Sequence, residues 1–252
     1  MPSPAEVTPG LVWVPELADP GHRIALDPES SRYVARVCRA RVGEQVQLTD
    51  GAGGWAATRV LDTRPHVTLE IERIERTPRA RSAHLLCGVP EGERGDWMVE
   101  KLAEFGVHVL QPIDCERAAW DRFEQRRERW DRLALAALRQ SRSRFRMAIQ
   151  TPMPLVAALE ALPAGHVGVV AAQGGRPAGV EPVPGAAIVA GAVGPSPGFS
   201  PRERDAFEGR GWGRIALAGN RLRTETAALA WAAWWARGTP ATEPASDFDS
   251  EA

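Results

Sequence analysis

The chain has 252 residues, of which 44% are hydrophobic and 25% charged, an ordinary composition for a globular protein with a sizeable core. Its formal net charge of −1 excludes a uniformly basic nucleic-acid binder, and no apolar run reaches the roughly 18 residues of a membrane-spanning helix. The N-terminus lacks the regions of a signal peptide, and three scattered cysteines favour buried thiols. We therefore expect a cytoplasmic protein without disulfides or a metal.

The first part of the chain predicts a small β-rich unit over residues 11–74. Short runs rich in β-branched residues predict strands at 11–14, 44–50, 55–61 and 67–74. The segment Asp50-Gly51-Ala52-Gly53-Gly54 is typical of a hairpin turn. Asp27, followed by Pro28, predicts the N-cap and first position of a short helix that reaches Arg39. Thr77 to Arg81 reads as a linker.

Beyond the linker, apolar runs alternate with helical patterns, which predicts a parallel sheet covered by helices on both faces. The expected strands are 83–89, 107–113, 167–172, 186–193 and 214–218. The expected helices are 96–105, 121–142, 154–162, 201–208 and 225–237. Residues 239–252 are acidic and rich in proline, alanine and serine, so we expect them to be disordered.

Positive charge is concentrated in the middle of the chain. From Arg117 to Arg146 there are ten arginines and four acidic residues. Such a stripe is typical of a phosphate-binding surface, but a solvated helix face has the same composition. Charge alone leaves both interpretations open.

Two glycine-rich turns each join an apolar run to the start of a helix. The first reads GPSPGFS from Gly194 to Ser200, and the second reads GNRLRTETA from Gly219 to Ala227. Ser200 and Glu203 have the spacing of a capping box. In open α/β sheets, loops at the ends of neighbouring strands line the ligand-binding crevice. The sequence therefore predicts a ligand site between these two turns.

Both turns resemble the C-terminal motifs of the RsmE family of 16S rRNA uracil-N3 methyltransferases, which belong to the knotted SPOUT class. The family patterns read roughly GPEGGFS and LGxRILRTETA. Ser196 and Pro197 stand where the family has Glu and Gly, and the chain is one residue shorter between Arg221 and Leu222.

Weaker resemblances lie elsewhere in the chain. Lys101 to Val107 is similar to the family's KATELGV, and Cys115 to Arg117 matches TER. Arg139 to Ser143 resembles EQSGR with an arginine in place of the acid. Arg32 to Arg39 resembles HHLxxVLR with the histidine pair replaced, and Glu91 in Val89 to Gly92 stands where the family has lysine.

The resemblance implies an α/β fold in which a SPOUT-type parallel sheet with a C-terminal trefoil knot follows a small PUA-like β-barrel. The implied domains are 1–76 for the RNA-binding barrel and 77–238 for the methyltransferase. It also implies a homodimer that acts on a decoding-region uridine of 16S rRNA in the small ribosomal subunit. The implied cofactor is S-adenosyl-L-methionine, bound by Gly194, Pro195, Gly198, Leu217, Gly219, Asn220 and Leu222.

Methylating uracil N3 requires stabilisation of negative charge on the ring, for which the planar guanidinium group of arginine is suited. Arg223 and Arg221 are the candidates, and Glu225 is expected to accept a proton or to orient an arginine. The expected RNA-binding residues are Arg39, Arg117, Arg142 and Arg144.

Some alternatives stay open. Trp231, Trp234 and Trp235 have helical spacing, which is typical of core or dimer-interface packing, or of base stacking. The chain could be a SPOUT methyltransferase with another RNA target, or a catalytically inactive RNA-binding paralogue, as the departures at Ser196 and Pro197 suggest. A plain nucleotide-binding α/β protein would not need the Arg223-Thr224-Glu225 motif.

Overall fold

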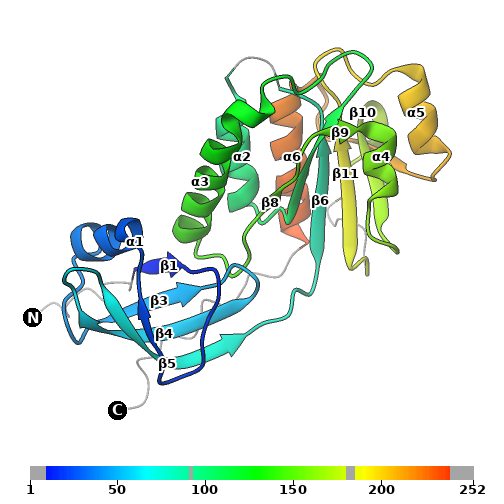
Figure 1. Ribbon diagram of the computed structural model, residues 1–252. Coiled ribbons are helices and arrows are strands. Elements are labelled where there is room, and N and C mark those ends of the chain that lie inside the picture. The colour runs from blue at the N-terminus through cyan, green and yellow to red at the C-terminus, as the bar shows by residue number, and fades with distance from the viewer. Residues whose placement is uncertain (1–9, 91–92, 180–184, 239–252) are drawn as a thin grey trace, which may run out of the picture. The chain divides into compact units, whose positions relative to one another are not determined.

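The computed structural model describes residues 10–90, 93–179 and 185–238, which fall into two compact units (Figure 1). The first unit contains residues up to 80, together with 99–108 and 124–148. The second contains residues 81–98, 109–123 and those from 149 onward. The expected disordered tail and the family-like residues Glu91 and Gly92 lie outside the described part of the chain.

The first unit is built on a five-stranded sheet in the order β1-β3-β4-β5-β2. Its strands are β1 (Leu11–Trp13), β2 (Arg23–Ala25), β3 (Gln45–Thr49), β4 (Gly54–Asp62) and β5 (Thr68–Arg76). β1 pairs with β3 in parallel, and the other pairs are antiparallel. Fully buried side chains such as Val12, Leu48 and Leu69 form its core. The four predicted strands are confirmed, whereas β2 is too short to show a hydrophobic period.

The predicted helix after Asp27 is confirmed at its start and corrected at its end. The Asp27 carboxylate accepts hydrogen bonds from the backbone N–H groups of Glu29 (2.8 Å) and Ser30 (2.9 Å), as an N-cap does. The helix α1 (Pro28–Arg32) then widens into the π-helix η1 (Tyr33–Val37). The helix does not reach Arg39, whose φ of 56° turns the chain into the left-handed region.

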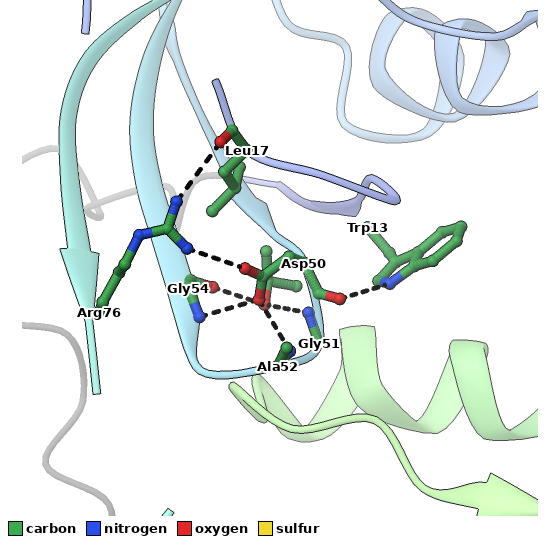
Figure 2. A network of polar contacts seen from close by, with 8 residues as sticks. Trp13, Leu17, Asp50, Gly51, Ala52, Gly54 and Arg76 are labelled. Atoms are coloured by element: carbon green, nitrogen blue, oxygen red, sulfur yellow. Dashed lines mark hydrogen bonds and ion pairs between the residues drawn. The ribbon is translucent and has the colours of Figure 1, made fainter. Parts of the chain in front are cut away.

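The hairpin predicted at Asp50 joins β3 to β4, and one carboxylate organises it (Figure 2). Asp50 Oδ1 accepts the N–H groups of Ala52 (2.7 Å) and Gly54 (2.8 Å), and Oδ2 lies 3.5 Å from Arg76 Nη1. Trp13 Nε1 donates to the Asp50 carbonyl at 3.0 Å. The turn is therefore tied to both β1 and β5.

The second unit is built on a sheet in the order β12-β10-β11-β6-β7-β8, with β9 paired to β7. Its strands are β6 (Ser82–Cys87), β7 (Val109–Asp114), β8 (Ala148–Ile149), β9 (Met153–Pro154), β10 (Val167–Pro177), β11 (Ile188–Val193) and β12 (Gly213–Ala216). The pairs from β12 to β7 are parallel, as predicted. β8 and β9 were not predicted, because two residues carry no period.

The remaining helices are α2 (Gly95–Glu104), α3 (Phe123–Ser141), α4 (Leu155–Glu160), α5 (Pro201–Glu208) and α6 (Thr224–Arg237). Of these, α2 from residue 99 and α3 from residue 124 belong to the first unit. Along β11, Ala190 and Ala192 belong to a core shared with α4 and α5. Gly191, between them, points the other way, and a Cβ there would lie 2.2 Å from the Trp231 ring of α6. Because successive residues of a strand face opposite sides, helices cover both faces of this sheet.

The three tryptophans of α6 lie in the core. Trp231, Trp234 and Trp235 are 0%, 8% and 2% exposed. Trp234 Nε1 donates to the Gly179 carbonyl at 2.9 Å, and the Arg81 guanidinium lies 4.7 Å from the centre of the Trp235 ring. Of the open alternatives, core packing is the one adopted, so this face gives no support to a dimer.

Candidate active site

The two glycine-rich turns contact each other. We call Gly194–Gly198, which follows β11, the first loop, and Leu217–Arg223, which follows β12, the second loop. Thr224 Oγ1 donates to the Gly194 carbonyl at 3.0 Å, and an Arg221 guanidinium nitrogen donates to the Ser196 carbonyl at 2.6 Å. Their predicted proximity is confirmed, but the expectation that they follow neighbouring strands is wrong, because β10 lies between β11 and β12 in the sheet.

Thr224 does not cap its own helix. The N-cap of α6 is Arg223, which makes no side-chain capping bond, and Thr224 is the first helical residue. Its hydroxyl reaches across to the first loop instead, which leaves the N-terminus of α6 without a side-chain acceptor from its cap residue. Unpaired N–H groups at a helix start attract negative charge.

The first loop is also held from the neighbouring strand β6. Gly88 N–H donates to the Val193 carbonyl at 2.9 Å, and a Cβ on Gly88 would lie 2.4 Å from the nitrogen of Pro195. A side chain at position 88 would therefore push the loop away. On the far side, Arg117 Nη1 donates to the Pro197 carbonyl at 3.2 Å.

The predicted capping box at the start of α5 is confirmed. Glu203 N–H donates to Ser200 Oγ at 3.2 Å, and Ser200 N–H donates to Glu203 Oε2 at 2.6 Å. Glu203 Oε1 also accepts the N–H of Glu116 at 2.9 Å, which ties the residues after β7 to this helix. Burial, with the charge of Glu203 as a second cause, raises the pKa of the Cys115 thiol.

Backbone groups of the second loop are open to a ligand. No backbone hydrogen bond between described residues uses Gly219, Asn220, Arg221 or Leu222. Gly219 and Asn220 are exposed, Leu217 and Leu222 are half-buried, and the space beside Gly219 is empty to 4 Å. Free amide and carbonyl groups at a loop with such space fit the polar edge of an adenine ring.

Glu225 is paired with an arginine that the sequence did not single out. Glu225 is 1% exposed, and its Oε1 accepts a hydrogen bond from Arg94 Nη1 at 2.6 Å. Its other oxygen, Oε2, is buried and has no partner among the described residues. Burial, assisted by the charge of Glu225, raises the pKa of the neighbouring Cys87 thiol to about 12. Of the two roles left open for Glu225, this geometry favours orienting an arginine.

The four arginines expected to bind RNA have different surroundings. Arg39 is exposed after η1, and Arg117 holds the first loop. Arg142 donates to Gln47 Oε1, and Arg144 is only 7% exposed, with Nη2 2.9 Å from Glu75 Oε2. Arg142 and Arg144 thus join the end of α3 to the barrel sheet within the first unit, and Arg144 has little surface left for a ligand.

Two departures from the family pattern contact each other. Tyr33 stands in place of a histidine, and Arg139 stands in place of an acid. The Arg139 guanidinium lies 5.2 Å from the centre of the Tyr33 ring, within the range of a cation–π interaction. This contact attaches α3 to η1 within the first unit.

A basic cavity that the sequence did not predict lies in the first unit. It has a volume of about 660 Å³, between α1 and the turn that connects β4 to β5. Its lining, taken from the described residues, contains no carboxylate and four basic side chains, those of Arg32, Arg36, Arg64 and His66. These residues are scattered in sequence, so no local pattern could reveal them.

Three further observations concern metal binding, membrane-spanning helices and the cysteines. Within the described ranges, no cluster of three or more His, Cys, Asp or Glu side chains could bind a metal ion. None of the described helices has the length and apolar character needed to span a bilayer. The cysteines make no disulfide; Cys87 is buried, whereas Cys38 and Cys115 are half-buried rather than fully buried as expected.

Comparison with known proteins assigns this arrangement of parallel strands, paired loops and a barrel-like N-terminal sheet to the RNA methyltransferases. Residues 77–236 match the family model of an RNA methyltransferase domain, and residues 26–72 match that of an RNA methyltransferase PUA domain. The ribosomal RNA small subunit methyltransferase E of Mycobacterium bovis is 30% identical over 233 residues, covering 86% of this chain and 87% of that protein. The chain belongs to the RsmE family of RNA methyltransferases.

Solved structures show the same fold. The ribosomal RNA small subunit methyltransferase E of Neisseria gonorrhoeae, crystallised with S-adenosyl methionine, has a TM-score of 0.78 and 26% identity, covering 90% of this chain and 96% of that one. A predicted RNA methyltransferase from Thermotoga maritima has a TM-score of 0.62 and 18% identity, covering 89% and 97%. The expected α/β class with an N-terminal PUA-like domain is confirmed.

Proposed function

We propose that this protein methylates N3 of a uridine in 16S rRNA of the small ribosomal subunit, with S-adenosyl-L-methionine as the methyl donor. The observation that carries the proposal is the hydrogen-bonded contact between the first and second loops in a chain of the RsmE family. The named relatives act on small-subunit rRNA, and one was crystallised with this cofactor.

We propose that the cofactor lies between the two loops, contacting Gly194, Pro195, Gly198, Leu217, Gly219, Asn220 and Leu222. Bound there, it supplies a methyl group on a positively charged sulfonium. The open backbone groups of the second loop bind its adenine edge, and the Thr224 hydroxyl keeps the loops at a constant separation. No metal is required for this transfer.

The reaction needs negative charge on the uracil ring to be stabilised as the N3 proton leaves. Arg223, exposed at the N-cap of α6, is the principal candidate, because a guanidinium can contact a ring oxygen there. Arg221 adds positive charge but also holds the first loop through Ser196. The N-termini of α5 and α6 contribute further positive potential.

Glu225 acts in this proposal by orienting Arg94 and not as the proton acceptor. One of its oxygens is already bonded to Arg94, and the other is buried. A base must come within hydrogen-bond reach of the proton it removes. We propose that the proton leaves to solvent.

We propose that residues 1–76 form an RNA-binding PUA-like domain and residues 77–238 the methyltransferase domain. The two family-model matches, 26–72 and 77–236, support this division. Arg39 and the basic cavity are the candidate RNA contacts on the barrel, and Arg117 is the candidate on the second unit. Arg144, being buried, is better assigned to the fold.

Three further properties are proposed from the family resemblance: a C-terminal trefoil knot, a cytoplasmic location and a homodimer. The buried tryptophans of α6 do not support the dimer, so it rests on the resemblance alone. Light scattering at micromolar protein concentration should give twice the mass of the 27.3 kDa chain. A single-chain mass would contradict the dimer and leave the methyltransferase proposal intact.

Mass spectrometry of rRNA from a deletion strain tests the activity directly. We expect one uridine of 16S rRNA to lose its N3-methyl group and to regain it when the gene is restored. If the methylation of 16S rRNA is unchanged in the deletion strain, the proposal is contradicted. A change in another RNA would keep the chemistry and correct the target.

Calorimetry tests the cofactor site, with micromolar affinity expected for the wild-type protein. Gly219→Trp should abolish binding, because a Cβ at this position has no atom within 4 Å and the indole would extend into the space proposed for the cofactor. Ala164→Trp, in an exposed turn outside the site, is the control. No heat at millimolar cofactor with the wild-type protein would indicate an RNA-binding paralogue without activity.

A further inference from the structure

Arg94 and Trp97 lie three residues apart at the start of α2 and have no assigned role. Arg94 precedes the first helical residue, and its carbonyl accepts the N–H of Met98 at 3.0 Å. Residues three apart on a helix lie on one face. Trp97 is 49% exposed, an unusual degree for so large an apolar side chain.

The Arg94 guanidinium is anchored at one end and open at the other. Its side chain is 50% exposed, while that of its partner Glu225 is 2% exposed. Arg94 Nη1 donates to Glu225 Oε1 at 2.6 Å, which engages one end of the guanidinium. A guanidinium has five N–H donors, so donors remain for an anion.

The position of this pair in the second unit relates it to the methylation site. Glu225 belongs to the first turn of α6, one residue after Thr224, whose hydroxyl bonds the first loop. Gly88, which follows β6, lies directly against Pro195 of the first loop. Arg94 is thus linked through Glu225 to the turn of α6 that bonds the first loop.

We propose that Arg94 and Trp97 form a binding subsite for one unpaired nucleotide of the substrate RNA, next to the uridine that is methylated. The guanidinium binds a phosphate, and the indole stacks on a base. Glu225 is a positioning residue that holds Arg94 in place. Proteins bind unpaired RNA with this combination of cationic and aromatic side chains. The inference rests on the proposed RNA methyltransferase activity.

The buried position of Glu225 explains why an arginine is held there so firmly. A carboxylate removed from water is costly unless it is paired, so Arg94 cannot swing away without leaving a buried charge behind. A preoriented guanidinium loses less conformational freedom when it binds a phosphate. The pair therefore favours a recognition role beyond packing.

Steady-state kinetics on purified small ribosomal subunits lacking the modification test the subsite. Trp97→Ala should raise KM for the subunits by about 5- to 150-fold, the range for loss of one stacked base, with kcat nearly unchanged. Trp97→Phe should restore most of the affinity. Val156→Ala, which alters another half-exposed apolar side chain in the same unit, should leave KM unchanged.

Arg94→Ala should raise KM and lower the salt dependence of RNA binding by about 0.7 in logarithmic slope, the value for one single-strand phosphate. Glu225→Gln should raise KM with a smaller effect on kcat. A selective fall in kcat would instead make Glu225 part of the chemistry and contradict its positioning role. Because loss of Arg94 can unfold the protein, cofactor calorimetry checks each variant, and Trp97→Ala, at an exposed site, keeps the test decisive.

Two results would overturn the subsite. One is a normal KM in both Trp97→Ala and Arg94→Ala. The other is a raised KM accompanied by a change of mass in light scattering, which would show that a second copy of the chain covers Trp97. If the wild-type protein methylates no RNA, the proposed function fails instead, so the two failures are distinguishable.

Discussion

Thr224 donates its hydroxyl hydrogen to the carbonyl of Gly194, across 30 residues of chain and at 3.0 Å. The bond links the first turn of α6 to the first loop. A threonine that could have capped its own helix thus sets the distance between the two loops proposed to hold the cofactor.

Thr224→Val should therefore weaken cofactor binding, because valine has nearly the shape of threonine but no hydroxyl group. Loss of the hydrogen bond leaves a carbonyl without its partner, and a typical bond of this kind contributes about 1 kcal/mol, or roughly fivefold in affinity. Calorimetry with S-adenosyl-L-methionine measures the change. Thr224→Ser, which keeps the hydroxyl, should bind normally; equal affinities for the valine and serine variants would contradict the role of the bond.

Arg223→Ala should lower turnover by roughly 10²-fold or more, the usual effect of removing a donor that stabilises charge developing in the transition state. Cofactor affinity should change little, because the sulfonium is itself positive. Single-turnover methylation and calorimetry separate the two effects. Loss of cofactor binding with normal chemistry in the remaining complex would make Arg223 structural.

The basic cavity of the first unit predicts a salt-dependent contact with RNA. The double variant Arg36→Ala/Arg64→Ala should reduce affinity for small ribosomal subunits. It should also lower the slope of log K against log salt by about 0.7 to 2, the value for one to two phosphate contacts. Filter binding over a salt series measures both. Arg23→Ala, which removes an exposed arginine of the same unit outside the cavity, is the matched control. If Arg23→Ala and the double variant give equal slopes, the cavity has no specific role in RNA binding.

Asp27 predicts a pH dependence of the stability of the first unit. Burial alone would raise the pKa of this carboxyl, but hydrogen bonds from Ser30 and Glu29 outweigh it and lower the pKa below its ordinary value. A lowered folded-state pKa means that the stabilisation is present above the unfolded-state pKa and is lost as pH falls through the folded value. The ionised cap should therefore stabilise the fold at neutral pH and lose this contribution progressively as the pH falls below about 4.

Urea unfolding of the wild type and Asp27→Asn at pH 7 and pH 3 tests this. Asparagine caps about as well but does not ionise, so the wild type should be more stable at pH 7 by up to about 1 kcal/mol, and the difference should shrink at pH 3. A difference that stays constant with pH would rule out the ionised cap as its source.

Much of this protein could be read from local sequence, because local rules govern those features. The alternation of strands and helices after residue 81, the hairpin at Asp50 and the capping box at Ser200 depend on neighbours within a few residues. The two loops were found because glycine-rich turns at strand ends have both a composition and a place in a parallel sheet.

Only the tertiary structure decided which distant groups meet. Arg94 and Glu225 are 131 residues apart, and nothing in either segment specifies the other. The tryptophans of α6 have the same spacing whether they pack in a core or a dimer, and Gly191 opposite Trp231 settled the choice. Short strands such as β2 are defined by pairing with β5 and not by their own residues. Such features depend on contacts between segments that are far apart in the sequence. The hydrophobic period of a segment shows only which of its faces is buried and not which partner covers that face.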